Sequence, residues 1–578
     1  MSLPNVGTGA SQAVARRAFL AGLVGIAGIS VLACAGGSPA QPTANAALAP
    51  TAPSAAAATT PAGSAMSPTA APKPTPRTST TVTPQAQAAS AVDHSGQILL
   101  TPEQQYGVGS GLQVVANLYM KKYPNVKVQV DVKPQDGYSD WARAQITGGT
   151  KSSMMTATFL QDLLAADKFV DLTPYLQRQS PYVDKKWIDT FQPGTWRPDS
   201  PTNAIQQMNL MRTNVVWFYN QDLFKKAGLD PTKPPTTWTE LMNIAETLKK
   251  AGIQAFSIEG DYDGFWRMNL GWWRRLFLDS YIRDTVQYTR SQKGDFNYRP
   301  DVDGKWQYNP KDPYNDDYTE MTNNPNRVVA AILDKKFIVD SDIFRDAYGN
   351  HMRKMVNYCD PGYFGLSREL ARQAFIAGKA AMWSDQPVFF PVYEKIVGAP
   401  NASIKRFNYS VFPYVTFDDS KLIEAPQRTF VGDLGFWVIP KKDQKQNDLE
   451  VDFFQFLTSP PVAKEFMLAG LTQPGGDLVG PMPILGVEMP DVWKQRFDQM
   501  KDIGPAGPNA SNYGGALLNE QQAARDYVDL TQRWFSNKIG DAEYFKSLQK
   551  SFEDTVPRLI KDQGLHPDKP EQRPTPRK

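Results

Sequence analysis

The chain is 578 residues long, which is more than one domain of ordinary size, and its charge is nearly balanced, with 62 basic and 59 acidic residues. No basic stripe is interleaved with stacking aromatics, which argues against a nucleic-acid-binding protein. Two cysteines, Cys34 and Cys359, are too few for a disulfide framework. A hydrophobic content of 41% is enough for large cores, so the body of the chain is predicted to fold.

The first 34 residues have the layout of an export signal. Arg16 and Arg17 precede an apolar segment that ends in small residues at VLAC, residues 31–34. The run ARRAFLA resembles a twin-arginine signal, and VLAC resembles a lipoprotein cleavage site that would make Cys34 the acylated first residue. Leu32 departs from that pattern, and an uncleaved N-terminal anchor is the alternative.

Residues 35–96 are dominated by Ala, Pro, Thr and Ser, a composition that cannot bury enough apolar area to offset the entropy of folding. We expect a disordered tether here, with a glycosylated or wall-spanning stalk as the alternative.

Folded sequence is expected from about Gln97. Strands are predicted at 97–100, 126–132 and 154–159, and helices at 109–123 and 138–146. This alternation of strand and helix predicts an α/β fold with a mostly parallel sheet covered by helices.

The central stretch, residues 215–252, begins with an apolar strand at 215–219. A short helix starts at Asn220 and stops at Gly228, and Thr237 with Glu240 forms a capping box for a second helix. Further downstream, Asn324 and Pro325 mark another helix start. Helices are also predicted at 342–356, 366–376, 519–535 and 541–556, and strands at 255–260, 380–383, 407–412 and 430–440.

Three motifs in order resemble one family. The first is YN-x-D-x-F-x-x-x-G from Tyr219 to Gly228, followed by P-x-T-W-x-E-L from Pro235 to Leu241. The second is AFIAGKAAMWSDQP at 374–387, and the third is GFWVIPKK with the helix that follows it, at 435–466. Together they resemble the extracellular solute-binding proteins of bacterial ABC importers, which include the maltose- and other sugar-binding proteins.

The resemblance implies a two-lobed periplasmic-binding fold of type II, each lobe a mostly parallel sheet flanked by helices, with the ligand in the cleft. We assign residues 97–212 and 428–500 to lobe one, and 213–427 and 501–562 to lobe two. Residues 283–323 lack any sustained period and are read as an insertion in lobe two, either a binding loop or lid or a surface decoration. Residues 563–578 form a tail that is expected to be frayed.

No enzyme motif, metal-ligand spacing or cofactor loop is found, so no catalytic residue, metal or cofactor is expected. His351 is expected on the surface, and Cys359 as a packed core thiol.

Sugar sites combine aromatic plates with carboxylates and amides, and in such folds they lie at the carboxyl ends of strands. Asp261, Asp263 and Trp266 follow a strand and have both ingredients. The remaining candidates come from other strand ends and crossings: Thr213, Asn214, Asp385, Gln386, Asp433, Phe436 and Tyr513.

Two departures from the family pattern concern the ligand. GGTKSSMM at 148–155 lacks the family's G-x-x-P-D, and Val388 and Phe389 stand where relatives often carry a stacking tryptophan. The expectation is a lipid-anchored, monomeric protein outside the cytoplasm that binds a carbohydrate, a mono- or oligosaccharide, by hinge closure and delivers it to ABC permease subunits. The alternatives are a ligand-sensing or adhesive lipoprotein on the same fold and a secreted two-lobed hydrolase.

Overall fold

The computed structural model describes residues 92–104, 109–135, 137–157, 160–196, 204–317, 319–418, 427–473, 478–500, 503–504 and 521–575. All of them belong to one compact unit, Ala88–Lys578. The predicted export signal with Cys34, nearly all of the tether, and Tyr513 lie outside the described residues.

The first sheet has the strand order β2-β1-β3-β9. Its strands are β1 (Gly96–Thr101), β2 (Val126–Val130), β3 (Met154–Thr156) and β9 (Trp437–Val438). β1 pairs in parallel with β2 and β3, whereas β9, from much later in the chain, runs antiparallel to β3. This sheet is therefore mostly parallel, as the strand–helix alternation predicts.

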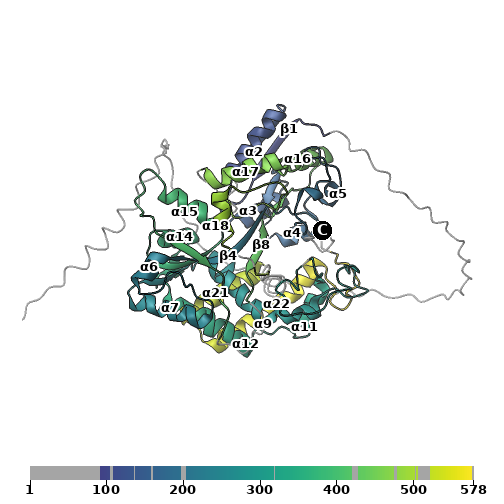
Figure 1. The fold of residues 1–578 in the computed structure, drawn as a ribbon. Coiled ribbons are helices and arrows are strands. Elements are labelled where there is room, and N and C mark those ends of the chain that lie inside the picture. Colours follow the sequence, from purple (N-terminus) through teal and green to yellow (C-terminus); the bar gives the residue numbers. More distant parts are fainter. Residues whose placement is uncertain are drawn as a thin grey trace, which may run out of the picture. The chain divides into compact units, whose positions relative to one another are not determined.

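The second sheet has the order β5-β6-β4-β7, and β8 pairs with β4 off this path (Figure 1). Its strands are β4 (Met211–Asn220), β5 (Gln254–Ser257), β6 (Ala380–Asp385), β7 (Tyr409–Phe412) and β8 (Phe430–Leu434). Only β5 and β6 are parallel, and β4 is antiparallel to β6, β7 and β8. The sheet is mixed rather than mostly parallel, because β4 enters it from the opposite end to β6.

β4 is the element that joins the two halves of the fold. Its first five residues, 211–215, pair with β8, and its last five, 216–220, pair with β6 and β7. Just before β4, Met208 forms a bridge with Trp437 in the first sheet. Two antiparallel strands, β4 and β8, therefore cross between the sheets side by side.

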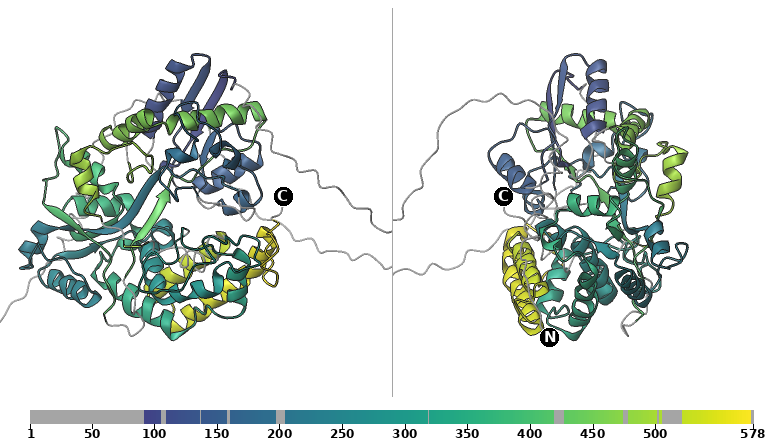
Figure 2. Two further views of the ribbon diagram at one scale, coloured as in Figure 1. Left: turned by 45° about the vertical axis from the view of Figure 1, so that its right-hand side comes forward. Right: turned by 90° about the vertical axis from the view of Figure 1, so that its left-hand side faces the viewer.

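Helices pack on both sheets (Figures 1 and 2). Around the first sheet these are α2 (Gly109–Lys122), α3 (Tyr138–Thr147), α4 (Gln161–Ala165), α5 (Thr173–Leu176), α16 (Gln444–Leu457) and α17 (Pro460–Thr472). Helix α18 (Asp491–Phe497) lies instead beside the helix that carries Phe390, with the rings of Phe390 and Phe497 5.5 Å apart. Those in the remaining part are α6 (Gln221–Lys226), α7 (Trp238–Lys250), α8 (Tyr262–Trp266), α9 (Asn269–Ile282), α10 (Val286–Thr289), α11 (Pro325–Leu333), α12 (Asp342–Phe344), α13 (Arg353–Met355), α14 (Arg368–Ile376), α15 (Phe389–Val397), α21 (Gln521–Phe535) and α22 (Asp541–Gln563).

The predicted helix signals are confirmed at the residue level. Thr237 and Glu240 make both hydrogen bonds of the capping box that starts α7. The Asn324 side chain caps α11, with Pro325 in its first turn. Between Phe344 and Arg353 the predicted helix is a π-helix, η4 (Arg345–Met352). Short 3₁₀ turns complete the described part: η2 (Ile188–Thr190), η3 (Arg283–Thr285), η5 (Val356–Tyr358) and η6 (Tyr363–Gly365).

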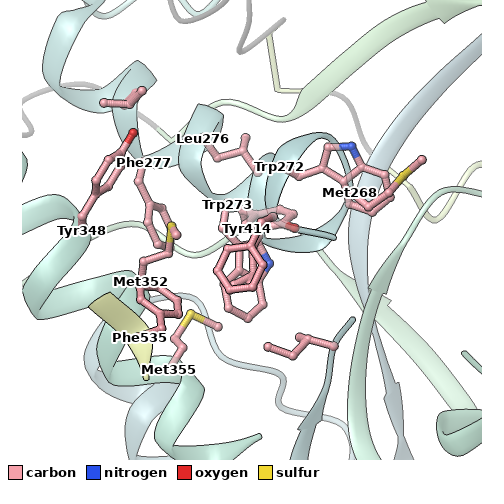
Figure 3. Close-up of a cluster of buried hydrophobic side chains, with 14 of the residues drawn as sticks. Met268, Trp272, Trp273, Leu276, Phe277, Tyr348, Met352, Met355, Tyr414 and Phe535 are labelled. Atoms are coloured by element: carbon pink, nitrogen blue, oxygen red, sulfur yellow. The ribbon is translucent and has the colours of Figure 1, made fainter. Parts of the chain in front are cut away.

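Aromatic side chains dominate the core around the second sheet (Figure 3). Trp272 and Trp273 are both buried there, at 2% and 0% exposure. Cys359 is a buried thiol, which confirms the prediction. The prediction for His351 is wrong: its ring is fully buried, with Phe417 at a centroid distance of 4.2 Å, because the helix that carries it packs against α9.

The expectation of a frayed tail is also wrong. α22 continues through Pro557 to Gln563, and the segment after it lies against the insertion. The Asn324 side-chain amide donates to the Pro570 carbonyl at 3.0 Å, and the Asn326 amide donates to Gln572 at 2.8 Å. Backbone–side-chain hydrogen bonds therefore order this tail although its composition is polar.

The described residues of the insertion between α10 and α11 form no helix or strand, apart from a single bridge from Arg290 to Asn323. None of the helices in the described residues is both long and apolar enough to cross a membrane.

Candidate functional site: a pocket between the two sheets

A pocket of about 590 Å³ lies where segments that follow strands of both sheets meet. The first sheet contributes the turn after β2 and the start of α3, and the second contributes α8 after β5, together with the start of α21. Its lining residues are Gln135, Gly137, Tyr138, Ser139, Asp140, Arg143, Asp261, Tyr262, Asp263, Trp266, Arg267, Ala524 and Arg525.

The local sequence fixes α8 at this position. Asp261 is its N-cap, and Asp261 Oδ1 accepts a hydrogen bond from the Gly264 amide at 2.8 Å. One turn later Arg267 ends the helix, and its guanidinium binds Asp263 through two hydrogen bonds of 3.1 and 3.0 Å. The predicted trio of Asp261, Asp263 and Trp266 is thus brought together at the pocket.

The aromatic surface differs from the expected one. Trp266 is only 4% exposed, whereas Tyr262 is 42% exposed and stacks on it at a centroid distance of 6.3 Å and an interplanar angle of 17°. The plate available to a ligand is therefore chiefly Tyr262, with the indole of Trp266 behind it.

Two polar links cross the pocket between the sheets. Arg267 Nη2 lies 3.1 Å from Oε1 of Glu103, which follows β1 and is 1% exposed. Gln135 Nε2 donates to Asp263 Oδ2 at 2.7 Å. Asp263 and Arg267 therefore take part both in the pocket lining and in the contact between the two halves.

The lining cations differ in how they are neutralised. Arg267 has the two carboxylates named above, and Arg143 forms an ion pair with Asp162. Arg525 is exposed on α21 and makes no hydrogen bond or ion pair within the part of the chain that the structure describes. It is thus a cation available to a ligand.

A buried carboxyl group lies directly behind α8. Glu259 is fully buried and accepts hydrogen bonds from the backbone and side-chain nitrogens of Asn269, at 3.2 and 2.7 Å. Burial raises the pKa of Glu259 to about 7, and nearby Arg368 and the Asn269 hydrogen bonds only partly oppose this.

Asp385 and Gln386 are not among the residues that line the pocket. Asp385 is fully buried at the end of β6, paired with Arg368, and it accepts a hydrogen bond from the Trp383 indole at 3.1 Å. Gln386 is 3% exposed and accepts from Arg368 at 3.3 Å. Their polar atoms are satisfied within the protein.

Thr213 and Asn214 lie on β4, at 2% and 6% exposure. The Asn214 amide donates to the Met500 carbonyl at 2.8 Å, so it ties β4 to the segment that follows α18. The Thr213 hydroxyl is buried and has no hydrogen-bond partner among the described residues.

Asp433 pairs with Arg212 in the β4–β8 register. Phe436 has a φ of 46° and packs against the core around the first sheet, and its amide donates to Asn209 at 2.9 Å. Neither residue lines the pocket, and with Tyr513 outside the described residues, these three positions stay predictions.

The turn after β2 was missed by sequence reasoning. Gln135 begins the polar, glycine-containing run QDGYSD that follows the alternating strand, and Arg143 lies three residues after that run. The strand-end rule that selected Asp261 could have selected this run as well. Arg525 carried no such signal, because the sequence of helix α21 shows only an amphipathic pattern.

Within the described ranges, no group of three His, Cys, Asp or Glu residues could hold a metal ion.

Comparison with known proteins gives one family and one fold. The family model described as bacterial extracellular solute-binding protein matches residues 104–464. The chain is 26% identical over 273 residues to the sn-glycerol-3-phosphate-binding periplasmic protein UgpB of Escherichia coli K12, and 25% identical to that of Shigella dysenteriae. These alignments cover 46% of this chain, which spans about half the length (48%) of the curated relatives it matches.

Among solved structures, a chitin oligosaccharide binding protein matches with a TM-score of 0.57 at 14% identity, covering 80% of this chain and 100% of that one. Maltose-bound MalE3 of T. maritima matches at 0.52 and 17%, covering 79% and 99%. RafE in complex with raffinose matches at 0.53 and 17%, covering 79% and 100%. These likenesses show the two-lobed, type II periplasmic-binding fold.

Proposed function

The chain belongs to the bacterial extracellular solute-binding protein family, and on that premise we propose that it captures a small solute outside the cytoplasm and delivers it to the permease subunits of an ABC importer. The pocket between the two sheets is the proposed binding site. Solute binding without chemical conversion is the proposed activity, with the protein acting as a monomer.

A carbohydrate is the leading ligand. The observation that carries this proposal is the pocket itself, in which the Tyr262 plate stands beside the carboxylates of Asp261 and Asp263. Sugar rings stack on such plates through their apolar faces, while carboxylates accept hydrogen bonds from hydroxyls. The structural neighbours named for chitin oligosaccharide, maltose and raffinose support the same class.

A polyol that carries an anionic group is the second candidate. Arg525 favours it, because this lining cation is without a carboxylate partner in the described part of the chain. The curated relatives named for sn-glycerol-3-phosphate support this candidate.

A thermal-shift panel of neutral oligosaccharides, a uronate and glycerol 3-phosphate tests the proposal. At least one compound should raise Tm, since a ligand at 100 times its Kd stabilises by about 2.7 kcal/mol. Tyr262→Ala should remove that shift, while Tyr288→Ala, a change at a comparably exposed tyrosine (47%) outside the pocket, should keep it. A broad panel that leaves Tm unchanged contradicts the proposal.

The two ligand classes separate at Arg525. Arg525→Gln should weaken binding of an anionic ligand at least tenfold and make it less sensitive to salt, but should change a neutral sugar little. Arg533→Gln, on the same helix and paired with Asp529 and Glu543, is the matched control.

Closure of the two lobes about β4 and β8 is the proposed mechanism, because a ligand between the sheets gains contacts from both only when they are close. The cross-pocket links Glu103–Arg267 and Gln135–Asp263 would rearrange in that motion. Small-angle scattering of the protein, with and without the compound of the panel that raises Tm, measures this closure.

Lipid anchoring through Cys34, with residues 35–96 as the tether, is proposed for the attachment to the membrane. Cys34→Ser should move the protein from the membrane fraction to the soluble extracytoplasmic fraction. A protein that stays membrane-bound contradicts the anchor.

Turnover of chromogenic glycosides would favour the hydrolase alternative, and the absence of neighbouring permease genes would favour an adhesive or sensing lipoprotein.

A further inference from the structure

One part of the insertion contacts Arg428 just before β8, Gly504 and the loop at Gly194. We name residues 313–317 and 319 the brace. The Pro313 carbonyl packs on Gly504, where an added Cβ would come within 2.0 Å of it. At the other end, the Thr319 methyl lies 3.2 Å from the position of a Cβ on Gly194, in a loop bridged to the first-lobe segment around Ile484.

The brace is fastened by a buried ion cluster. Arg428, which stands two residues before β8, is 1% exposed in its side chain. Its guanidinium binds Asp279 of α9, with Nε at 2.9 Å from Oδ2, and Asp316 of the brace, with Nη2 at 3.1 Å from Oδ2. Asp279 also accepts from Arg283 at 2.9 Å. Both carboxylates are almost completely buried, at 0% and 2%.

This cluster has geometric consequences for β8. A guanidinium held by two carboxylates from different segments has a fixed orientation, because each pair imposes its own plane and distance. β8 therefore begins at a point that is set by α9 on one side and by the insertion on the other. Since β8 is one of the two strands that cross between the sheets, its starting direction bears on how the lobes sit relative to each other.

We propose that Asp316 is a positioning residue that fastens the insertion to the hinge through Arg428, so that the brace restrains the separation of the two lobes. The inference rests on the proposed closure about β4 and β8. It gives the insertion a role in the open–closed equilibrium rather than in ligand contact, consistent with its absence from the lining of the pocket.

The test measures the lobes directly and needs no ligand. Spin labels are placed on the full chain with Cys34→Ser, through Lys127→Cys in β2 and Lys250→Cys in α7, both exposed. Asp316→Asn keeps the shape of the side chain but removes its charge. The distribution of distances between the two labels should then be broader and shifted, compared with the distribution in the labelled protein that retains Asp316. Arg428→Lys keeps the positive charge but lacks the planar guanidinium that binds both carboxylates, and it should change the distance distribution in the same direction.

Asp295→Asn is the matched control. Asp295 lies in the same insertion, is equally buried, and binds Arg327 through two hydrogen bonds of 2.6 and 2.8 Å, but it faces the C-terminal tail rather than the hinge. It should lower Tm without changing the distance distribution. If Asp316→Asn and Arg428→Lys also lower Tm with unchanged distances, the proposal is overturned. Failure of the proposed solute binding would show separately, as a wild-type distribution that no compound in the panel changes.

Discussion

β5 and β6 are adjacent and parallel, and each has an acidic residue at its end or shortly after it, but these residues have different roles. The segment after β5 presents Asp261 and Asp263 to the pocket. The segment at the end of β6 holds Asp385 and Gln386 fully inside the protein. Position at a strand end is therefore not enough to make a polar residue a ligand contact.

Arg368 accounts for the difference. This arginine of α14 pairs with Asp385 and also stacks on Trp272 at 5.6 Å, so the protein supplies its own cation at the end of β6. After β5, burial raises the pKa of Glu259, and the positive charge of Arg368 opposes this only in part. Asp385 is paired inside the protein and is not among the residues that line the pocket, whereas Asp263 lines the pocket although it is paired with Arg267.

The largest effect is expected at Asp385. Asp385→Ala leaves the Arg368 guanidinium, which is 13% exposed, without its main partner and should cost about 3–5 kcal/mol in the free energy of unfolding. Denaturant unfolding measures this, and solute affinity of the folded fraction should be unchanged. A large loss of affinity with intact stability would instead make Asp385 a ligand contact.

Glu259 gives a pH-dependent effect of similar size. Its folded-state pKa of about 7 lies above the unfolded value of 4.5, so the unfolded state releases its proton first as the pH rises. Stability should therefore fall between pH 4.5 and pH 7, by about 3 kcal/mol from this group. Glu259→Gln should flatten that part of the stability profile, measured by denaturant unfolding at several pH values. Identical profiles would show that folding does not raise the pKa of Glu259.

Asp263 should show a moderate effect on both properties. Asp263→Asn weakens its bonds to Arg267 and Gln135, with a cost of about 1–2 kcal/mol in stability. It should also reduce solute affinity about tenfold or more, measured by calorimetry with the best compound of the panel. Undiminished affinity would remove Asp263 from the site.

The smallest effect is expected at Thr213. Thr213→Val removes a buried hydroxyl that has no partner among the described residues, so stability should stay equal or rise by up to about 1 kcal/mol. Solute affinity should not change. A clear loss of affinity in calorimetry would restore Thr213 as a ligand contact.

Local sequence signals predicted much of the fold. The capping box at Thr237, the Asn324–Pro325 helix start and the strand inside β4 all depend on neighbours in sequence, and each is present. α22 was predicted to stop before Pro557, because proline breaks helices in general, but packing of Phe552 and Leu559 keeps the helix continuous across it.

The site was predictable only in part, because its remaining determinants are long-range. Asp261 and Trp266 follow a strand, which sequence shows. By contrast, the burial of Trp266 beneath Tyr262, the pairing of Asp385 with a residue from another helix, and the approach of Arg525 from α21 depend on tertiary contacts. The lobe boundaries remain a prediction of the same kind.

The C-terminal segment has a practical consequence for shortening the protein. Asn324 and Asn326 are both completely buried, and the amides of both donate to carbonyls of residues 569–572, while the His566 amide donates back to Asn326 at 2.9 Å. Trimming the chain after Gly564 would remove both carbonyl acceptors of the Asn326 side-chain amide and would leave the Asn324 amide with Asp295 as its acceptor. The charged, proline-rich C-terminal segment thus packs against one side of the insertion and shields it from solvent.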